Sequence, residues 1–151
     1  MYSDERQKTR LEEVSKYISN GWKIFPVKHK GKKPLTKHGV KDASDDPRPF
    51  IQTCNIGLAT GEPSGVSVVD IDDPDDLAKL EAKFGKLPKT SISRTGRDGG
   101  GFHYYFQHDE RWNNVKNSTK IEGLDIDIRS TGGYVILPPS VHETGESYKW
   151  V

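Results

Sequence analysis

Three short segments of this chain alternate apolar with ionisable residues, and this pattern restricts the fold more than any other feature of the sequence. Successive side chains of a β-strand point to opposite faces, so residues two apart share a face. In residues 66–72, the apolar Val69 and Ile71 share one face. Asp70 and Asp72 share the opposite face. The segment therefore predicts a strand that packs on one side and carries charge on the other.

The same alternation recurs twice further along the chain. In residues 102–106, aromatic side chains occupy one face and His103 lies on the other. In residues 124–129, the apolar residues face the core and the ionisable residues face away from it. If the three strands pair, their ionisable faces form one patch, which consists of Asp70, Asp72, His103, Asp125, Asp127 and Arg129.

Helical periodicity and turn residues place the other elements. We expect a helix over residues 4–20, capped by Ser3 or Asp4, and a second helix over residues 74–84, capped by Asp73. Further strands are expected at residues 22–27, 55–59, 91–95 and 134–137. Strands that alternate with two helices indicate a single domain of the α/β or α+β class, spanning residues 1–151.

The composition excludes several classes of protein. Charges nearly cancel, with 23 Lys and Arg against 22 Asp and Glu. The single cysteine, Cys54, excludes an internal disulfide and a cysteine-based zinc site, and we expect it in the core. No apolar run reaches the roughly 18 residues of a membrane span, and the charged N-terminus is unlike a signal peptide. We therefore expect a soluble, cytoplasmic protein with no membrane partner.

The charges are nevertheless distributed unevenly. Seven lysines and no acid lie in residues 23–41, whereas five aspartates and no base lie in residues 70–76. Such asymmetry suits the joint binding of phosphates and divalent cations. Two solvated loops of opposite sign would give the same counts, so the positions of the charges have to decide between these interpretations.

Asp70 and Asp72 are the most specific candidates for chemistry. Two residues along a strand span about 6.6 Å, so both carboxylates can turn toward shared cations. Aspartate is depleted within strands, and the two like charges would repel without a cation. Hard oxygen ligands suit Mg²⁺ or Mn²⁺, and a carboxylate from Asp125 or Asp127 would complete a two-metal site. The structural alternative is that the aspartates end the strand and begin the next helix.

His103 follows three consecutive glycines, Gly99–Gly101. Glycines leave backbone N–H groups open to an anion, so this loop and His103 can bind a phosphate. The alternative is a flexible hairpin with a surface histidine at its exit. The loop is not a Walker loop, because the Gly-Lys-Ser/Thr ending is absent.

Six segments of the chain form a recognisable series. They are GWKIFPV at 21–27, GKKP at 31–34, NIGLATG at 55–61, VVDID at 68–72, GGGFHYYF at 99–106, and DIR at 127–129 with GYVILPPS at 133–140. The series closes on His142, Gly145, Tyr148 and Trp150. In order and spacing, from about residue 11 onward, it resembles the bifunctional DNA primase/polymerase N-terminal domain of the archaeo-eukaryotic primase superfamily.

The resemblance implies a particular fold and metal site. The fold is the archaeo-eukaryotic primase fold, in which an RNA-recognition-motif-like catalytic sheet joins a small N-terminal α/β unit. Asp70, Asp72 and Asp127 are implied to be catalytic and to bind Mg²⁺ or Mn²⁺. The third ligand is assigned to Asp127 rather than Asp125, because Ile-Arg and the later Gly-Tyr-Val-Ile-Leu-Pro-Pro-Ser run follow Asp127.

The resemblance also implies a nucleotide site. His103 is expected to contact the phosphates of the incoming nucleotide. Gly101 stands where many members of the wider superfamily have a serine, so a hydroxyl contact is lost and the backbone N–H remains. Arg129 and Lys33 are further candidates for phosphate contact, with Lys32 beside them. A solvated lysine loop is the alternative for the two lysines.

We therefore expect a metal-dependent, template-directed nucleotidyltransferase, a DNA primase and polymerase that acts in DNA replication, in the setting of a mobile element, phage or plasmid. Its partners would be a DNA template and primer, a dNTP or NTP, and a downstream helicase domain or protein. Two alternatives use the same residues. A metal-dependent nuclease is weakened by the absence of a His-x-His pair, and a single-stranded nucleic-acid-binding module would use Tyr105 and the lysine segment.

Overall fold

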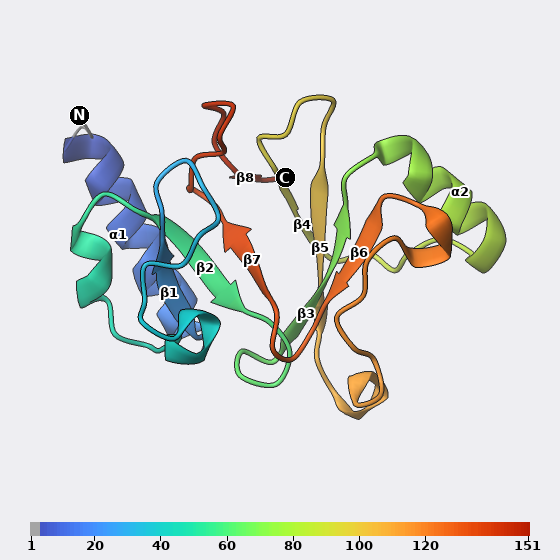
Figure 1. Ribbon diagram of the computed structural model, residues 1–151, viewed down its shortest axis with the longest axis horizontal. Helices are drawn as coiled ribbons and strands as arrows, with labels where there is room; N and C mark the ends of the chain where they lie inside the picture. Colours follow the sequence, from blue (N-terminus) through green and yellow to red (C-terminus); the bar gives the residue numbers. More distant parts are fainter. Residues whose placement is uncertain (1–3) are drawn as a thin grey trace.

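The computed structural model describes residues 4–151, so Ser3, one of the two expected helix caps, lies outside the described residues. Two antiparallel sheets are set at an angle to each other (Figure 1). Helix α1 (Asp4–Ser19) lies beside the smaller sheet, and helix α2 (Pro74–Phe84) lies beside the larger one. This arrangement confirms the expected α+β class.

The two sheets have different sizes and strand orders. The smaller sheet has the order β1-β2-β7, with β1 at Ile24–Val27, β2 at Asn55–Ala59 and β7 at Tyr134–Leu137. The larger sheet has the order β6-β3-β5-β4-β8, with β3 at Val66–Ile71, β4 at Ser91–Arg94, β5 at Phe102–Gln107, β6 at Ile126–Arg129 and β8 at Lys149–Trp150. Short 3-10 helices lie at Gly39–Asp42, Arg48–Ile51, Glu110–Trp112 and Ile121–Gly123.

The three alternating segments do pair, as expected. Strand β3 lies between β5 and β6, and Asp70 is opposite His103 on one side and Asp127 on the other. Their shared face is only partly polar, however. Val68 and Tyr105 on the same face are buried in the main core, where they pack with residues of α1 and β2. The ionisable residues therefore occupy one end of this face, and the other end joins the two sheets.

Strand β6 begins at Ile126, two residues later than expected. The preceding residues form a 3-10 helix, and the backbone N–H of Asp125 donates to the Asp76 carboxylate at 2.8 Å. Asp125 therefore lies outside the strand and does not belong to the inner ionisable face. The expectation that Asp125 joins the patch around Asp70 is wrong for this reason.

Helix α2 begins as expected and covers the outer face of the larger sheet. The Asp73 carboxylate accepts a hydrogen bond from the N–H of Asp75 at 3.0 Å, which caps the helix. The spacing of Leu77, Leu80 and Phe84 predicts the buried side. Leu77 and Leu80 do pack against the apolar face of β3. Phe84 is 63% exposed, because it is the last helical residue and extends beyond the sheet.

One continuous core joins both sheets to α1. It contains Val14 and Tyr17 from α1, Ile24, Ile56, Leu58, Val135 and Leu137 from the smaller sheet, Val66, Val68 and Tyr105 from the larger sheet, and Phe50 and Cys54 from the connecting segment. The burial of Cys54 confirms its expected core position. At the junction, Gly61 has a φ of +81° and a Cβ there would collide with the backbone of Thr131, so only glycine fits without strain.

Within residues 4–151, neither helix combines the length and the apolar character that crossing a membrane requires.

Candidate active site

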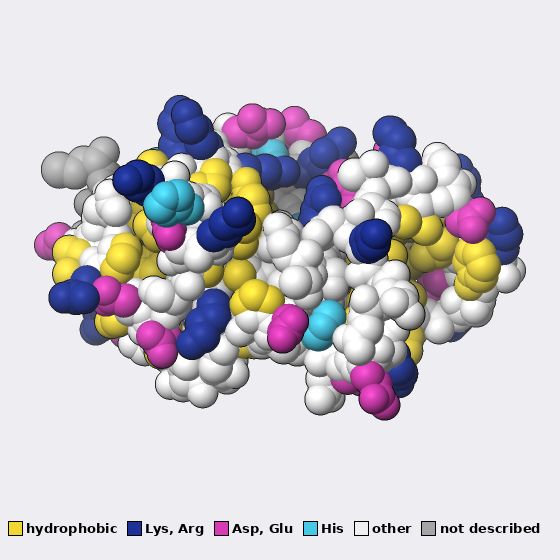
Figure 2. Space-filling model, turned by 60° about the horizontal axis from the view of Figure 1, so that its bottom comes forward, with side chains coloured by type: hydrophobic (Ala, Val, Ile, Leu, Met, Phe, Trp, Pro, Cys, Tyr) yellow, Lys and Arg dark blue, Asp and Glu magenta, His cyan; other side chains and the backbone are white. Residues whose placement is uncertain are grey.

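A cavity of about 440 Å³ lies between the two sheets. Figure 2 shows Lys and Arg side chains around a hollow near the middle of one face of the molecule. The cavity is lined by acids and bases from both sheets and by the turn between β6 and β7. Its charged and histidine residues are Lys32, Asp70, Asp72, Arg97, His103, Arg129 and His142. The structure therefore brings the acidic segment and one lysine of the basic segment into a single site.

Asp70 and Asp72 form the acidic side of this cavity. Asp70 lies on β3 and its side chain is 16% exposed, whereas Asp72 follows the strand and is 31% exposed. His103 places Nε2 at 3.4 Å from Asp70 Oδ1, within ion-pair distance but without hydrogen-bond geometry. Asp70 Oδ1 and His103 Nδ1 are both buried and make no hydrogen bond. Because buried polar atoms are nearly always hydrogen-bonded, this pair is incomplete without a ligand.

The pKa values of Asp70 and Asp72 are shifted in opposite directions. Burial raises the pKa of Asp70, but His103, Lys32 and Arg129 together outweigh burial, and the pKa lies below its ordinary value. Burial and the charge of Asp70 raise the pKa of Asp72 above its ordinary value, although Arg97 opposes this. Asp72 therefore carries its negative charge at a cost that a bound cation would remove.

Lys32 and Arg97 form a basic side of the cavity. The backbone at Lys32 is fixed, because its carbonyl accepts a hydrogen bond from the Tyr134 hydroxyl at 2.9 Å. The neighbouring Gly31 carbonyl accepts from the Asn55 amide at 3.1 Å. Arg97 follows β4 and places Nη1 at 3.7 Å from Asp72 Oδ1. The two cations thus come from loops on different sheets and can both contact an anion in the cavity.

His142 adds a hydrogen-bond donor to the same cavity. The backbone N–H of Thr144 donates to His142 Nδ1 at 3.2 Å, so the neutral ring carries its proton on Nε2. Burial lowers the pKa of His142, and the nearby Lys32 lowers it further. The ring packs against Tyr148, with the two centroids 5.9 Å apart. His142 is therefore a neutral donor at neutral pH, held beside Lys32.

Asp127 lies beside this cavity with both carboxylate oxygens engaged. Oδ1 accepts a hydrogen bond from the backbone N–H of Lys120 at 3.0 Å. Oδ2 accepts from Nη2 of Arg129 at 3.1 Å. Arg129 lines the cavity, whereas Asp127 is not among its lining residues. Asp127 is near enough to Asp72 for its negative charge to raise the pKa of Asp72.

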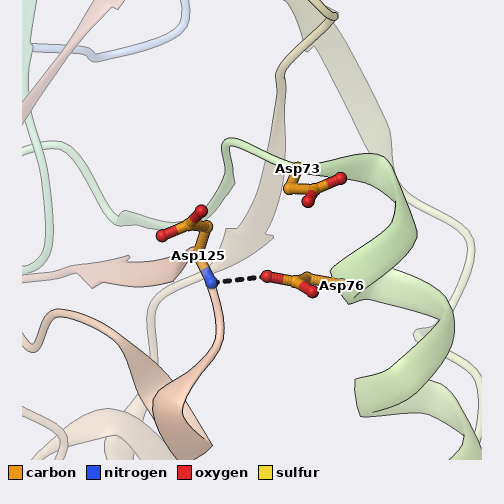
Figure 3. Close-up of side chains that lie close together, drawn as sticks. All are labelled: Asp73, Asp76 and Asp125. Atoms are coloured by element: carbon orange, nitrogen blue, oxygen red, sulfur yellow. Dashed lines mark hydrogen bonds between the residues drawn. The ribbon is translucent and has the colours of Figure 1, made fainter.

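A second acidic cluster lies outside the cavity, at the start of α2. Within residues 4–151, Asp73, Asp76 and Asp125 are the set whose carboxylate oxygens lie within 4.8 Å of one another (Figure 3). Asp76 is the centre of this set, and its two oxygens accept from the Asp125 N–H and, at 3.1 Å, from Lys79 Nζ. Lys120 Nζ lies 3.3 Å from Asp125 Oδ1. The hydrogen bonds and ion pairs within the protein account for this cluster.

The other expected site residues lie at the edge of the cavity or away from it. Lys33 is exposed and its carbonyl accepts from the N–H of Lys28, and it does not line the cavity. Gly101 is buried, with its carbonyl bound to the N–H of Thr95, and it also does not line the cavity. A Cβ at Gly101 would lie 2.5 Å from Thr95 Oγ1, so the structure accounts for glycine at this position by packing.

Arg97, Asn117 and His142 line the cavity, and the sequence analysis assigned no role to them. Asn117 donates to the Thr131 carbonyl at 2.9 Å and accepts from the Ser130 N–H at 2.8 Å, which fixes the turn before β7. Arg97 and His142 belong to the Gly-rich loop and to the closing motif. Their positions in those two segments could have indicated a role in the site. Neither loop, however, has a periodic pattern that predicts where a side chain points.

Strand-borne carboxylates opposite Lys and Arg, in a cleft between two sheets, are typical of enzymes that transfer phosphoryl or nucleotidyl groups with divalent metals. Residues 14–151 match the family model described as "Bifunctional DNA primase/polymerase, N-terminal", and the chain belongs to this family. No curated protein matches the chain. Membership confirms the resemblance seen in the sequence motifs. The family implies nucleic-acid and nucleotide substrates and dependence on a divalent metal.

Proposed function

We propose that this domain is a metal-dependent nucleotidyltransferase that extends a DNA strand on a template, using a dNTP or NTP. The observation that carries the proposal is the cavity, in which Asp70 and Asp72 face Lys32, Arg97 and Arg129. A nucleoside triphosphate with divalent cations has the complementary charges. Its phosphates would pair with the Lys and Arg side chains, and the cations would pair with the Asp carboxylates. A volume of about 440 Å³ lies in the range of small-ligand sites.

The residues present fit Mg²⁺ or Mn²⁺. Asp70 has a buried carboxylate oxygen that makes no hydrogen bond, and Asp72 bears a charge that its surroundings disfavour. Both ligands are hard oxygens, which these cations prefer. Asp70 and Asp72 would hold the metal, and Asp127 would contribute a further carboxylate from the adjacent strand. When bound, such cations lower the pKa of the attacking 3′-hydroxyl and stabilise the leaving pyrophosphate.

The protein side chains would then bind and orient the substrate. Lys32 and Arg97 would contact the phosphates from opposite sheets, and Arg129 would contact them from β6. His142 would donate from Nε2 without adding charge. His103, buried against Asp70, would keep that carboxylate ionised and oriented, as its effect on the Asp70 pKa indicates. This differs from the phosphate contact expected for His103 from the family resemblance.

Primer extension with the Asp70→Asn variant tests the proposal. Wild-type protein should extend a labelled primer on a template in Mg²⁺ or Mn²⁺ and release pyrophosphate. Asp70→Asn should lower the rate by at least about 100-fold, the scale on which single charge-stabilising groups act in such sites. Asp73→Asn is the matched control, because Asp73 lies three residues away outside the cavity, and it should retain the wild-type rate. Equal extension by wild-type and Asp70→Asn protein would contradict the proposal.

The same assay separates the two alternative functions. A nuclease would shorten the labelled strand and release no pyrophosphate. A nucleic-acid-binding module would bind the template in both variants and show no turnover. As a further part of the proposal, strand separation ahead of the primer would come from a helicase domain or protein, because the 151 residues contain no Walker loop.

A further inference from the structure

The third expected metal ligand is held away from the other two. Asp127 lies opposite Asp70 in the sheet, yet its Oδ1 is bonded to the Lys120 N–H at 3.0 Å and its Oδ2 to Arg129 at 3.1 Å. Within residues 4–151, Asp70, Asp72 and Asp127 do not form a set whose carboxylate oxygens lie within 4.8 Å of one another. Two carboxylates are therefore ready to bind a cation, and the third is occupied by donors from the protein.

Arg129 is positioned to interact with two different partners. It lies two residues from Asp127 on the same face of β6, and its side chain is 29% exposed. It also lines the cavity together with Asp70 and Asp72, where the phosphates would bind. A guanidinium has five N–H donors in a planar fork, which match a phosphate in a two-point contact. Arg129 can thus exchange a single hydrogen bond to Asp127 for paired bonds to a phosphate.

We propose that Arg129 is a positioning residue that withholds Asp127 from the metal site until the triphosphate of the incoming nucleotide binds. The inference rests on the proposed function, and it adds an order of assembly. Without nucleotide, Asp70 and Asp72 bind the cation, and Asp127 remains paired with Arg129. When phosphate engages Arg129, Asp127 Oδ2 is released toward the cation. Full metal ligation therefore requires the substrate.

Mn²⁺ affinity, measured by titration calorimetry or from the spectrum of free Mn²⁺, tests this without any turnover. In the absence of nucleotide, Asp127→Asn should lower Mn²⁺ affinity by less than about threefold, because Asp127 is not yet a ligand. With a non-hydrolysable dNTP analogue present, the same variant should lower Mn²⁺ affinity by about 10-fold or more, the scale of losing a metal-site contact. Equal losses in the two conditions would overturn the proposal.

The Arg129→Met background gives the second arm of the experiment. Without Arg129, Asp127 Oδ2 loses its protein donor while Oδ1 keeps the Lys120 N–H, so Asp127→Asn should now lower Mn²⁺ affinity by about 10-fold or more even without nucleotide. Arg97→Met is the matched control, because it removes one positive charge from the same cavity and leaves the Asp127 pair intact. In the Arg97→Met background, Asp127→Asn should still cost less than about threefold. Identical behaviour of the two backgrounds would overturn the proposal.

A different result of the same Mn²⁺ measurements would contradict the proposed function itself. If Asp70→Asn leaves Mn²⁺ affinity unchanged with and without the nucleotide analogue, the cavity is not the metal site, and the proposed function is wrong. If Asp70→Asn lowers the affinity in both conditions but Asp127→Asn has the same effect in both, the metal site is correct and only the role of Arg129 is wrong. Melting temperatures of all variants in a chelator verify that each remains folded.

Discussion

The negative charge of Asp72 would help to bind a cation, but it lowers the stability of the folded protein when no cation is bound. Its pKa is raised by burial and by Asp70, so folding disfavours the ionised form. An acid with a raised pKa destabilises the folded state above its ordinary pKa, near 4, and this effect disappears as pH falls below that value. Without metal, Asp72 is thus a source of instability at neutral pH.

We predict that Asp72→Asn raises the melting temperature at pH 7 in a chelator while it abolishes primer extension. A gain of about 1 kcal/mol would correspond to roughly 2–4 °C for a domain of this size. The gain should shrink toward pH 4, where wild-type Asp72 becomes protonated. Asp45→Asn, at an exposed acid paired with Lys23, is the control and should shift the melting temperature little. A lower melting temperature for Asp72→Asn at pH 7 would contradict the electrostatic account.

Asp125 and Asp127 differ in which of their groups makes the main contacts, the backbone in Asp125 and the carboxylate in Asp127. Asp125 contributes its backbone, because its N–H binds Asp76 and its carbonyl accepts from the N–H of Asp72 at 2.9 Å. Its carboxylate is half exposed and contacts Lys120. Asp127 instead places its carboxylate between Lys120 and Arg129, next to the cavity.

We predict that Asp127→Asn lowers the rate of metal-dependent extension by at least about 100-fold, whereas Asp125→Asn lowers it by less than about threefold. Asparagine keeps the shape of each side chain and leaves the backbone contacts of Asp125 intact. The measurement is single-turnover extension of a primed template at saturating Mg²⁺. The opposite ranking would place the third ligand at Asp125 and remove the role given to Arg129.

At the residue scale, the sequence pattern predicted strand residues better than loop residues. Asp70, His103 and Asp127 were predicted to share a face if their strands pair, because strand alternation is a local rule, and the register confirms that the strands pair in this way. Arg97 and Asn117 had no such rule, because their positions depend on contacts with distant segments. Asp125 was misplaced because a partly buried hydrogen bond from its N–H to Asp76 interrupts the alternation.

At the scale of elements, the start of α2 and the segment before β6 are joined through Asp76. This carboxylate is buried and binds the Asp125 N–H and Lys79. The N–H of Asp125 lowers the pKa of Asp76, and Lys79 lowers it further. An acid with a lowered pKa stabilises the fold above its ordinary pKa, and that stability is lost as pH falls.

We predict that Asp76→Ala lowers the melting temperature at pH 7 by several degrees, and that the difference shrinks as pH falls from about 4 toward the lowered pKa of Asp76, because the wild-type carboxylate is protonated there. Asp75→Ala in the same helical turn is the control, because Asp75 is exposed, and its effect should be small. Mn²⁺ affinity of Asp76→Ala should equal that of wild type. A large loss of Mn²⁺ affinity would instead identify Asp73, Asp76 and Asp125 as a metal site.

Elements with local signals were predicted, and those that depend on distant pairing were not. Helix α2 was predicted from its aspartate cap and following proline, and β3 from its alternation and bounding glycine. Strand β8 has only two residues and exists because Trp150 and Lys149 pair with Ser93 and Arg94. No property of two residues predicts a strand whose partner lies more than fifty positions away.

At the scale of the whole molecule, the cavity of about 440 Å³ between the two sheets, with its Lys and Arg side chains, suits a single incoming nucleotide. Extension needs that nucleotide and a primer end, whereas starting a strand requires two free nucleotides to be ordered together. We predict that synthesis on a primed template exceeds synthesis on an unprimed one by at least about 10-fold, the factor that corresponds to about 1.4 kcal/mol of additional ordering cost. Labelled products resolved by length measure both. Equal yields would contradict this.

The end of α1 contacts both sheets, and this has a consequence for unfolding. The Tyr17 hydroxyl donates to the Pro138 carbonyl beyond β7 at 2.5 Å, and it accepts from Trp150 Nε1 of β8 at 3.1 Å. Trp22 stacks between Tyr17 and Tyr105 of the larger sheet, at 5.3 and 6.2 Å. The sheets should therefore melt as one cooperative unit, with near-equal amide exchange protection in β2 and β5. Tyr17→Ala removes the buried ring together with both hydrogen bonds, and it should therefore make the exchange protection of β2 and β5 diverge.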